Sequence, residues 1–363
     1  MQRKFSHKIK RIVVKVGTSV LANNKFEIDG RRLKNVVEGI CDLIKQGLEV
    51  ILVSSGAVVS GMSILGIKCR PQGLACIQAT AACGQLILMR RYSDLFKQKK
   101  INCGQILLTW DDFDSRERYL NAKNTILSLL EYKTLPIINE NDTVSTEEIK
   151  FGDNDRLSAL VACMVEADLL IVLSDVDGIY EIKNSKSHII EQVTELNSSI
   201  QNLAKDTLKK QISKGGMRTK LEAAKIVTES GIDCIVANGK IKGILKKLVS
   251  GEIIGTHILS KARTIGAKKR WIAFGTKPKG KIYIDDGCKQ ALLNKGKSLL
   301  APGIIRAEGN FSAGDIVSII DKDGFELGRG LVHYSQSDLE RNRGNKFHNE
   351  VIHRNNLVLT QGK

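Results

Sequence analysis

Residues 169–174 read LLIVLS, an unbroken run of apolar side chains that ends in a serine. Strands of a parallel sheet are buried on both faces and read as continuous apolar runs, whereas a half-exposed strand alternates apolar and polar residues. Comparable short runs occur at residues 11–16, 50–54, 105–110, 136–139 and 233–237. The sequence therefore predicts a sheet of mostly parallel strands.

Longer stretches with helical periodicity lie between these strands, at residues 31–46, 73–97, 116–132, 155–166 and 217–230. Alternation of strands and helices is typical of a doubly wound α/β fold, in which helices sandwich the sheet. In such sheets, ligands bind beyond the carboxyl ends of the strands. Functional residues are therefore expected directly after the strands.

The pattern changes after residue 259. Residues 260–271, SKARTIGAKKRW, are basic and lack apolar periodicity, which is typical of a linker, here predicted over residues 260–275. The short apolar runs that follow are separated by Gly, Asn and Asp, as in a small β-barrel. With 363 residues, of which 42% are hydrophobic, the chain can bury two cores. We predict an α/β domain over residues 8–259, a small β domain over residues 276–355, and a final strand at residues 351–359, VIHRNNLVL.

The chain carries a formal net charge of +17, and its basic residues are spread along the whole length. Basic proteins often bind nucleic acid, acidic membranes or phosphorylated ligands, and a solvated lysine-rich surface without a partner is the alternative. No run of about 18 apolar residues is present, so no membrane-spanning helix is expected. The basic N-terminus lacks a long apolar region and a cleavage site, so no secretory signal is expected either.

Eight cysteines stand at positions 41, 69, 76, 83, 103, 163, 234 and 288, without a C-x-x-C pair or histidines at zinc-like spacing. We therefore expect no metal site built from protein side chains and a reducing, cytoplasmic location. Cys41, Cys163 and Cys234 lie in apolar segments and should be core residues. Positions 69, 76 and 83 recur every seven residues, and core packing on one helix face is expected for them too.

Two clusters of small residues follow the first two predicted strands. Lys15 and Gly17 lie in KVGTS, where a glycine lets a phosphate approach the backbone and a lysine supplies a point charge for a phosphoryl group. Ser55 and Gly56 lie in SSGA, where a strand-to-helix turn can expose backbone N–H groups to an anion. Taken alone, each cluster is also compatible with a plain turn.

Residues 136–162, PIINENDTVSTEEIKFGDNDRLSALVA, hold a dense group of amide and carboxylate side chains between a strand and a helix. Such residues are poor material for a core, which favours a ligand site. Asp142 and Asn154 could hold the ammonium and carboxylate groups of an amino acid. A helix N-cap is the alternative for Asp155, and a solvated acidic loop is the alternative for the whole segment.

Two further turns are candidates for nucleotide contacts. Residues 174–180, SDVDGIY, follow the LLIVLS run and are interpreted as a nucleotide-contacting turn or a simple β-turn. Residues 214–220, KGGMRTK, open a predicted helix, and their paired glycines, basic residues and helix N-terminus favour a polyphosphate site. A plain loop before a helix is the alternative for the second segment.

None of the six histidines falls in these clusters, and no Ser–His–Asp or Cys–His arrangement emerges. A nucleophile that is already ionised, such as a carboxylate, needs no base. Phosphoryl transfer to it depends on positioning and on neutralising charge at the γ-phosphate. The clusters therefore favour phosphoryl transfer over hydrolytic chemistry.

Six motifs in order, VVKVGTS, VSSGAV, INENDTV, KFGDNDRLSA, LSDVDGIY and GGMRTK, resemble those of the glutamate kinase branch of the amino-acid kinase family. The later segments RWIAFGTKPKG, IDDG and GNFSAGD resemble the PUA domain that bacterial members carry. The resemblance covers the chain almost end to end. It implies ATP-dependent phosphorylation of the γ-carboxylate of L-glutamate to L-glutamyl 5-phosphate, the first step of proline biosynthesis.

The resemblance also implies roles for individual residues. Lys15 and Lys220 would stabilise the transferring phosphoryl group, with Asp155 orienting both ammonium groups. Glutamate would contact polar side chains after the second and fourth strands, namely Ser55, Asn139, Asp142, Lys150, Asp153 and Asn154. ATP would contact Lys15, Ser174, Asp175, Lys214, Gly215, Gly216, Met217, Arg218, Thr219 and Lys220, and Mg²⁺ would bridge its phosphates with few direct protein ligands.

A homo-oligomer (dimer or tetramer) and hand-over of the acyl phosphate to glutamate-5-semialdehyde dehydrogenase are implied as well. Acetylglutamate, aspartate and uridylate kinases are the nearest alternatives within the family, and the INEND and GDND motifs and the second domain argue against them. RNA binding through the basic C-terminal domain is the alternative from another class. It would favour exposed aromatic residues or a clustered basic stripe, and several of the aromatic residues there are expected to be core.

Overall fold

The computed structural model describes residues 3–23, 25–145, 154–183, 186–196, 200, 216–260, 266–341 and 350–359. The chain divides into two compact units, the first made of residues 1–112 and 116–264 and the second of residues 113–115 and 265–363. Among the described residues, no helix is both long and apolar enough to cross a membrane.

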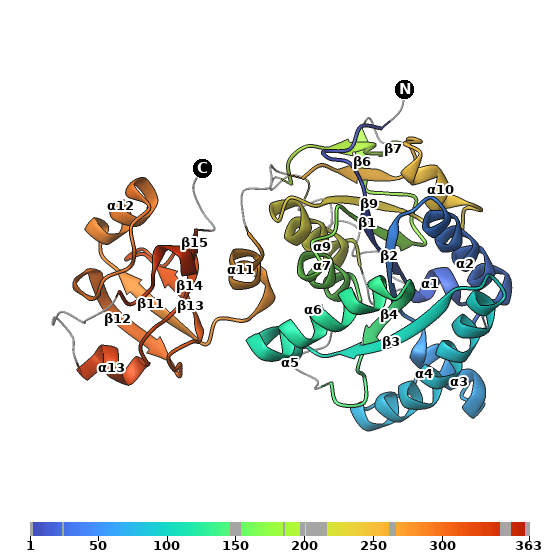
Figure 1. Ribbon diagram of the computed structural model, residues 1–363, viewed down its shortest axis with the longest axis horizontal. Helices are drawn as coiled ribbons and strands as arrows, with labels where there is room; N and C mark the ends of the chain where they lie inside the picture. Colours follow the sequence, from blue (N-terminus) through green and yellow to red (C-terminus); the bar gives the residue numbers. More distant parts are fainter. Residues whose placement is uncertain are drawn as a thin grey trace. The chain divides into compact units, whose positions relative to one another are not determined.

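An eight-stranded sheet forms the centre of the first unit (Figure 1). Its strands lie in the order β3 (Asn102–Leu108), β4 (Thr134–Glu140), β2 (Glu49–Ser54), β1 (Arg11–Val16), β5 (Leu169–Ser174), β9 (Asp233–Asn238), β10 (Thr256–Ile258) and β8 (Gln192–Val193). The central strand β1 pairs in parallel with β2 and β5, and β10 is antiparallel to β9. The predicted mostly parallel α/β sheet is therefore confirmed.

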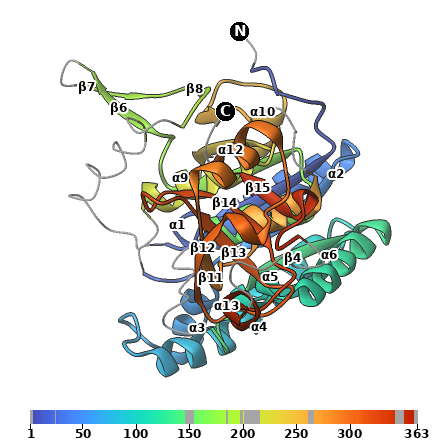
Figure 2. The same ribbon diagram turned by 90° about the vertical axis from the view of Figure 1, so that its left-hand side faces the viewer.

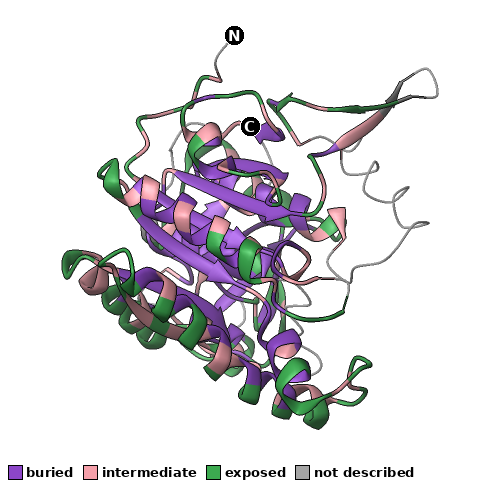
Figure 3. Cartoon of the chain, turned by 90° about the vertical axis from the view of Figure 1, so that its right-hand side faces the viewer, coloured by how far each residue is buried: buried purple, intermediate pink, exposed green. Residues whose placement is uncertain are grey.

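Helices cover both faces of this sheet (Figure 1). One face carries α6 (Arg116–Glu131), α7 (Asp155–Met164) and α9 (Met217–Glu229), and the other carries α2 (Gly30–Lys45), α4 (Leu74–Lys97) and α10 (Ile244–Val249). The helices expose their outer sides while the sheet between them is buried (Figure 3). The unit also contains a short helix, α1 (Thr18–Leu21), and an antiparallel hairpin of β6 (Tyr180–Lys183) and β7 (Lys186–Ile189).

The side chains of β1 point alternately to the two faces of the sheet. Ile12, Val14 and Val16 pack into the core shared with α2, α4 and α10. Successive side chains of a strand point to opposite faces, so Lys15 points to the face that α7 and α9 cover. This places a charged side chain between Val14 and Val16, within the apolar part of β1.

Two sequence predictions fail at the ends of β3 and β2. The strand predicted at residues 105–110 ends at Leu108, because the Asp112 carboxylate accepts hydrogen bonds from Thr109 N and Oγ1, at 2.6 and 3.0 Å, and turns the chain into helix α5 (Trp110–Asp114). Helix α3 (Ala57–Leu65) is missing from the predicted helix ranges, although the SSGA segment before it was interpreted as a strand-to-helix turn. It is short and nearly all apolar, so its periodicity is weak.

Helices α3 and α4 touch backbone to backbone. A Cβ at Gly61 would lie 1.8 Å from Thr80 O, and a Cβ at Gly84 would lie 1.8 Å from Ala57 O. Only glycine permits so close an approach. Because α3 begins directly after Ser55 and Gly56, this contact fixes the turn that follows β2.

The Gly84→Ala variant is expected to lower the free energy of unfolding by about 1–3 kcal/mol, because its methyl group overlaps the Ala57 carbonyl. The midpoint of denaturant unfolding measures the change. Gly30→Ala is the matched control, since a Cβ at Gly30 meets no atom within 4 Å, and it should be neutral or stabilising by up to about 1 kcal/mol. Equal midpoints for both variants would contradict this packing.

The burial predicted for the cysteines is confirmed for one group of three and wrong for another. None of the eight cysteines forms a disulfide, and Cys41, Cys163 and Cys234 are buried as predicted. The predicted core packing of Cys69, Cys76 and Cys83 is wrong, because all three are exposed. The first precedes α4, and the other two lie on the solvent side of that helix.

The second unit is built on a five-stranded sheet with the order β12 (Ile304–Gly309), β11 (Gly280–Ile284), β13 (Ile316–Ile320), β14 (Glu326–Leu331) and β15 (Leu357–Leu359) (Figure 2). Its helices are α11 (Ala267–Arg270), followed by a π-helical turn (Trp271–Gly275), α12 (Asp286–Lys295) and α13 (Gln336–Arg341). A separate apolar core, including Ile282, Val317 and Val351, holds it together. The predicted final strand is shorter than expected, and α12 was not predicted.

Candidate active site

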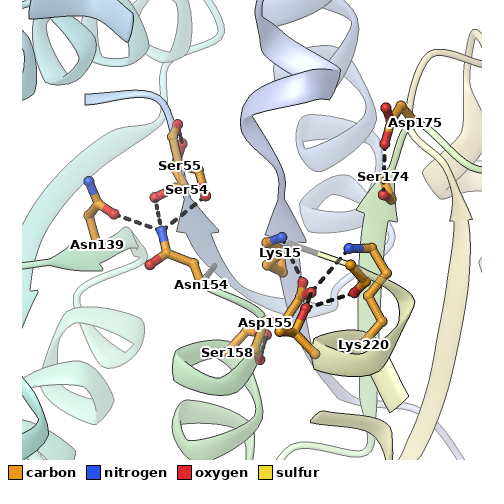
Figure 4. A network of polar contacts seen from close by, with 12 residues as sticks. Lys15, Ser54, Ser55, Asn139, Asn154, Asp155, Ser158, Ser174, Asp175 and Lys220 are labelled. Carbon is orange, nitrogen blue, oxygen red and sulfur yellow. Dashed lines mark hydrogen bonds and ion pairs between the residues drawn. The ribbon is translucent and has the colours of Figure 1, made fainter. Parts of the chain in front are cut away.

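The candidate site lies where β1, β2, β4 and β5 end, against the first turn of α7 (Figure 4). Carboxyl ends of neighbouring parallel strands meet at one edge of a sheet, which is where ligands of doubly wound folds bind. Asn154 and Asp155 are adjacent at the start of α7, and their side chains point in opposite directions (Figure 4). The site therefore has two halves joined by one helix end.

The first half is a buried cluster of three charged side chains, called here the phosphate cluster: Lys15, Asp155 and Lys220. Asp155 Oδ1 lies 2.6 Å from Lys15 Nζ, and Asp155 Oδ2 lies 3.2 Å from Lys220 Nζ. The three residues are 1%, 0% and 4% exposed. The structure thus brings together the three residues that the sequence predicted as catalytic.

Asp155 is held in place from two further sides. Thr219 Oγ1 donates to Asp155 Oδ2 at 2.9 Å, and Ser158 Oγ donates to the Asp155 carbonyl oxygen at 2.6 Å. The alternative interpretation of Asp155 as a helix N-cap is wrong, because Asn154 occupies that position and Asp155 turns its carboxylate to the lysines.

The charge of the phosphate cluster favours an anion. Burying charged groups is unfavourable unless opposite charges and hydrogen bonds compensate them. Two ammonium groups share the Asp155 carboxylate here, so the formal charges of these three side chains sum to +1. A Cβ at Gly17 would lie 3.4 Å from Lys15 Nζ, so the glycine keeps space open beside that ammonium group.

The second half is a set of amide and hydroxyl groups around Asn154, called here the amide half. Asn154 Nδ2 donates to the Ser54 carbonyl oxygen at 2.8 Å, to Asn139 Oδ1 at 2.8 Å and to Ser55 Oγ at 3.1 Å (Figure 4). These contacts join the ends of β2 and β4 to α7. Because Nδ2 is committed to these oxygens, Asn154 Oδ1 is the atom that can accept a hydrogen bond from a ligand.

Three residues of α4 support the amide half and were not predicted. Gln78 Nε2 donates to the Ser145 carbonyl oxygen at 3.0 Å, Gln85 Oε1 accepts from Asn139 at 2.8 Å, and Tyr92 OH contacts Ser54 Oγ at 2.9 Å. Their spacing of seven residues places them on one face of the helix. That spacing was the signal available in the sequence.

Asp142 lies just beyond β4 and is partly buried. Burial raises the pKa of Asp142 to about 6. Within the described part of the chain, no residue forms a hydrogen bond or an ion pair with its carboxylate. A desolvated carboxylate without a partner is a suitable receptor for a ligand cation.

The remaining predicted residues that the structure describes lie at the carboxyl end of β5 and at the N-terminal end of α9. Ser174 Oγ donates to Asp175 Oδ1 at 3.2 Å at the end of β5. Gly216 precedes α9, whose first turn contains Met217, Arg218, Thr219 and Lys220. Arg218 is 77% exposed and pairs with Glu222 at 2.8 Å. Four predicted residues lie outside the described part of the chain: Lys150, Asp153, Lys214 and Gly215.

Comparison with known proteins gives two family matches. Residues 10–238 match the Amino acid kinase family, and residues 280–352 match the PUA domain. A solved carbamate kinase from Giardia lamblia, bound to AMP-PNP, covers 69% of this chain and 99% of its own at a TM-score of 0.50 and 17% identity, which shows the shared fold.

The curated relatives are similar over nearly the whole chain. A glutamate 5-kinase of Dictyoglomus thermophilum is 45% identical over 96% of this chain and 97% of its own. One of Syntrophotalea carbinolica is 44% identical over 99% of this chain and 100% of its own. The chain therefore belongs to the amino acid kinase family, in its glutamate 5-kinase branch with a C-terminal PUA domain.

Proposed function

We propose that the protein transfers the γ-phosphoryl group of ATP to the γ-carboxylate of L-glutamate and forms L-glutamyl 5-phosphate, as the first step of proline biosynthesis. One observation carries this proposal. Two adjacent residues at the start of α7 face different halves of the site. Asp155 contacts the lysines of the phosphate cluster, and Asn154 contacts the groups of the amide half. Donor and acceptor are thereby held on either side of one helix end.

Glutamate is proposed to bind in the amide half. Its ammonium group faces the Asp142 carboxylate, which has no partner among the described residues, and Asn154 Oδ1, which can accept a hydrogen bond. Ser55 and Asn139 complete this pocket, and Lys150 and Asp153 are proposed members of it. The γ-carboxylate of the bound glutamate then extends past the start of α7 to Lys15.

In the proposed reaction, an oxygen of the γ-carboxylate attacks the γ-phosphorus. The new oxygen–phosphorus bond forms as the bond to the β-phosphate oxygen breaks, and ADP leaves with that electron pair. No proton moves, which is consistent with a site built from lysines instead of a base. Lys15 and Lys220 stabilise the negative charge of the transferring group, and Asp155 keeps the two ammonium groups oriented.

ATP is proposed to lie along the ends of β5 and α9, with Ser174, Asp175 and residues 214–220 as its contacts. The N-terminus of α9 carries partial positive charge, which favours phosphate oxygens. Mg²⁺ would arrive with ATP, be held mainly by the phosphates and neutralise their charge. Both oxygens of Asp155 face lysine ammonium groups, so we assign this carboxylate to the lysines.

The domain limits and partners are part of the proposal. Residues 8–259 would carry both substrates and the catalytic groups, residues 260–275 would link, and residues 276–355 would form the PUA-like domain. The protein is proposed to act as a homo-oligomer, dimer or tetramer, in the cytoplasm. An acyl phosphate is labile in water, which favours hand-over to glutamate-5-semialdehyde dehydrogenase.

Trapping the acyl phosphate with hydroxylamine tests the proposed function. The purified protein is incubated with ATP, Mg²⁺ and hydroxylamine, and with glutamate, aspartate or N-acetylglutamate in separate reactions. We expect hydroxamate and stoichiometric ADP with glutamate, and at least about tenfold lower kcat/KM with the other two acids. Activity on aspartate or N-acetylglutamate alone would refute the substrate assignment.

A further inference from the structure

A chain of three side-chain amides runs through the amide half and ends on α4. Asn154 Nδ2 donates to Asn139 Oδ1, and Asn139 Nδ2 donates to Gln85 Oε1, each at 2.8 Å. Gln85 belongs to none of the sequence motifs, because it lies in the middle of a long, largely apolar helix. Its place in this chain therefore calls for a physical explanation.

One backbone group fixes the orientation of these amides. The N–H of Glu140 can only donate, and it contacts Asn139 Oδ1 at 2.9 Å. The other end of the Asn139 amide must then be its NH₂ group, so the Gln85 atom in contact with it must be the oxygen. Gln85 Nε2 is consequently directed away from Asn139.

Gln85 Nε2 is buried and has no hydrogen-bond partner among the described residues. A buried donor without an acceptor is destabilising, and native proteins retain few of them. The polar residues one heptad before and after it on α4, Gln78 and Tyr92, both have partners. Of these three side chains, Gln85 alone keeps an open donor, and it does so beside the proposed acceptor pocket.

The order of the hydrogen-bonded amides also indicates which end of a substrate Gln85 would contact. Asp155 and the phosphate cluster lie on one side of the α7 start, and Asn154 and Asn139 lie on the other (Figure 4). Gln85 is one further hydrogen bond beyond Asn139. A substrate whose γ-carboxylate reaches the lysines therefore presents its opposite end, with the α-carboxylate, to the amides.

We propose that Gln85 is a specificity-determining residue of the acceptor pocket. Its Oε1 holds Asn139 in the orientation that Asn154 requires, and its Nε2 donates to the α-carboxylate of the amino-acid substrate. This assignment rests on the proposed glutamate kinase function. The carboxylate supplies the acceptor that Nε2 lacks, so the cost of the open donor is removed when substrate binds.

The Gln85→Glu variant separates the two roles of this side chain. A carboxylate oxygen still accepts from Asn139 Nδ2, so the support of Asn139 remains, while the donor is replaced by a negatively charged acceptor. We compare kcat/KM for glutamate with kcat/KM for isoglutamine, its α-carboxamide, by ADP release. The glutamate-to-isoglutamine ratio should fall about tenfold or more in the variant, because the introduced carboxylate repels an α-carboxylate and accepts from an α-carboxamide.

Both substrates are measured on one preparation, so any unfolded fraction lowers both rates equally and cancels in the ratio. Gln72→Glu is the matched control, since it makes the same change at an exposed position just before α4, and it should keep the wild-type ratio. A wild-type ratio in Gln85→Glu would overturn the inference. A wild-type protein without glutamate-dependent acyl phosphate would instead refute the proposed function.

Gln85→Met provides a second measurement if the charged variant does not fold. Methionine is close in size and neutral, and it lacks both the donor and the acceptor. The KM for glutamate should rise about tenfold while the KM for ATP stays within about twofold, because the nucleotide contacts lie on β5 and α9. An unchanged KM for glutamate would also overturn the assignment.

Discussion

Lys220→Met is expected to lower kcat by about three orders of magnitude and to leave the KM for glutamate within about threefold of wild type. Lys220 Nζ lies 3.2 Å from Asp155 Oδ2 in a site closed to solvent, where a fixed positive charge acts strongly on a transferring phosphoryl group. Asp155 keeps its contacts with Lys15 at 2.6 Å and Thr219 at 2.9 Å in the variant. The fold should therefore survive, and steady-state kinetics measures the loss.

Lys225→Met is the matched control for this prediction. Lys225 lies on the same helix, but its side chain is 53% exposed and its ion pair with Glu229 is 3.9 Å long. Exposed pairs of this kind contribute about 0–1 kcal/mol, so kcat should change less than about twofold. A loss in Lys220→Met that falls equally on kcat and on glutamate affinity would contradict its assigned role at the phosphoryl group.

The sequence predicted the core of the fold well because the central strands have a strong local pattern. The bounds of β1 and β5 agree with the predicted ranges residue for residue. Errors arise where tertiary contacts decide the structure. Helix α3 is held by glycine contacts with α4 that no local pattern reveals, and the exposed cysteines show that a seven-residue spacing identifies a helix face without saying whether it faces the core.

The site was predictable to the extent that it lies at the carboxyl ends of strands. Lys15 and Asn139 are the last residues but one of β1 and β4, and Asp155 is the first residue of α7. Gln85 and Tyr92 do not lie at such positions, since they are polar residues within a helix and their hydrogen bonds reach residues 54 and 38 positions away. A sequence alone does not show that their side chains meet the ends of β2 and β4.

Asp142→Asn should raise the KM for glutamate about a hundredfold or more and yet stabilise the protein without substrate. The ammonium group of glutamate loses a desolvated carboxylate partner, and removing one member of a buried ion pair costs about 3–5 kcal/mol. The proposed ATP contacts on β5 and α9 are untouched, so the KM for ATP should stay within about twofold. Glutamate titrations at fixed ATP measure the effect.

The gain in stability follows from the pKa of Asp142, which burial raises from 3.8 to about 6. A folded-state pKa above the unfolded value means that the folded protein holds this proton more tightly, so ionising the group between pH 4 and pH 6 destabilises the fold by up to about 3 kcal/mol. Asparagine does not ionise. Its free energy of unfolding should therefore exceed that of wild type by about 1–3 kcal/mol above pH 7 and approach it below pH 4.

Ionisation of Asp142 has the opposite effect on substrate binding: it destabilises the fold but favours the binding of glutamate. An ammonium group needs the ionised carboxylate, so kcat/KM for glutamate in the wild type should fall as pH drops through about 6, the pKa of Asp142. Asp142→Asn should lack this inflection, and the exposed Asp94→Asn should retain it. A variant that is less stable than wild type above pH 7, or that keeps the inflection, would show that Asp142 is not the receptor. In this interpretation the Asp142 carboxylate, which has no partner among the described residues, destabilises the substrate-free protein at the pH where it binds glutamate, and the bound substrate removes that cost.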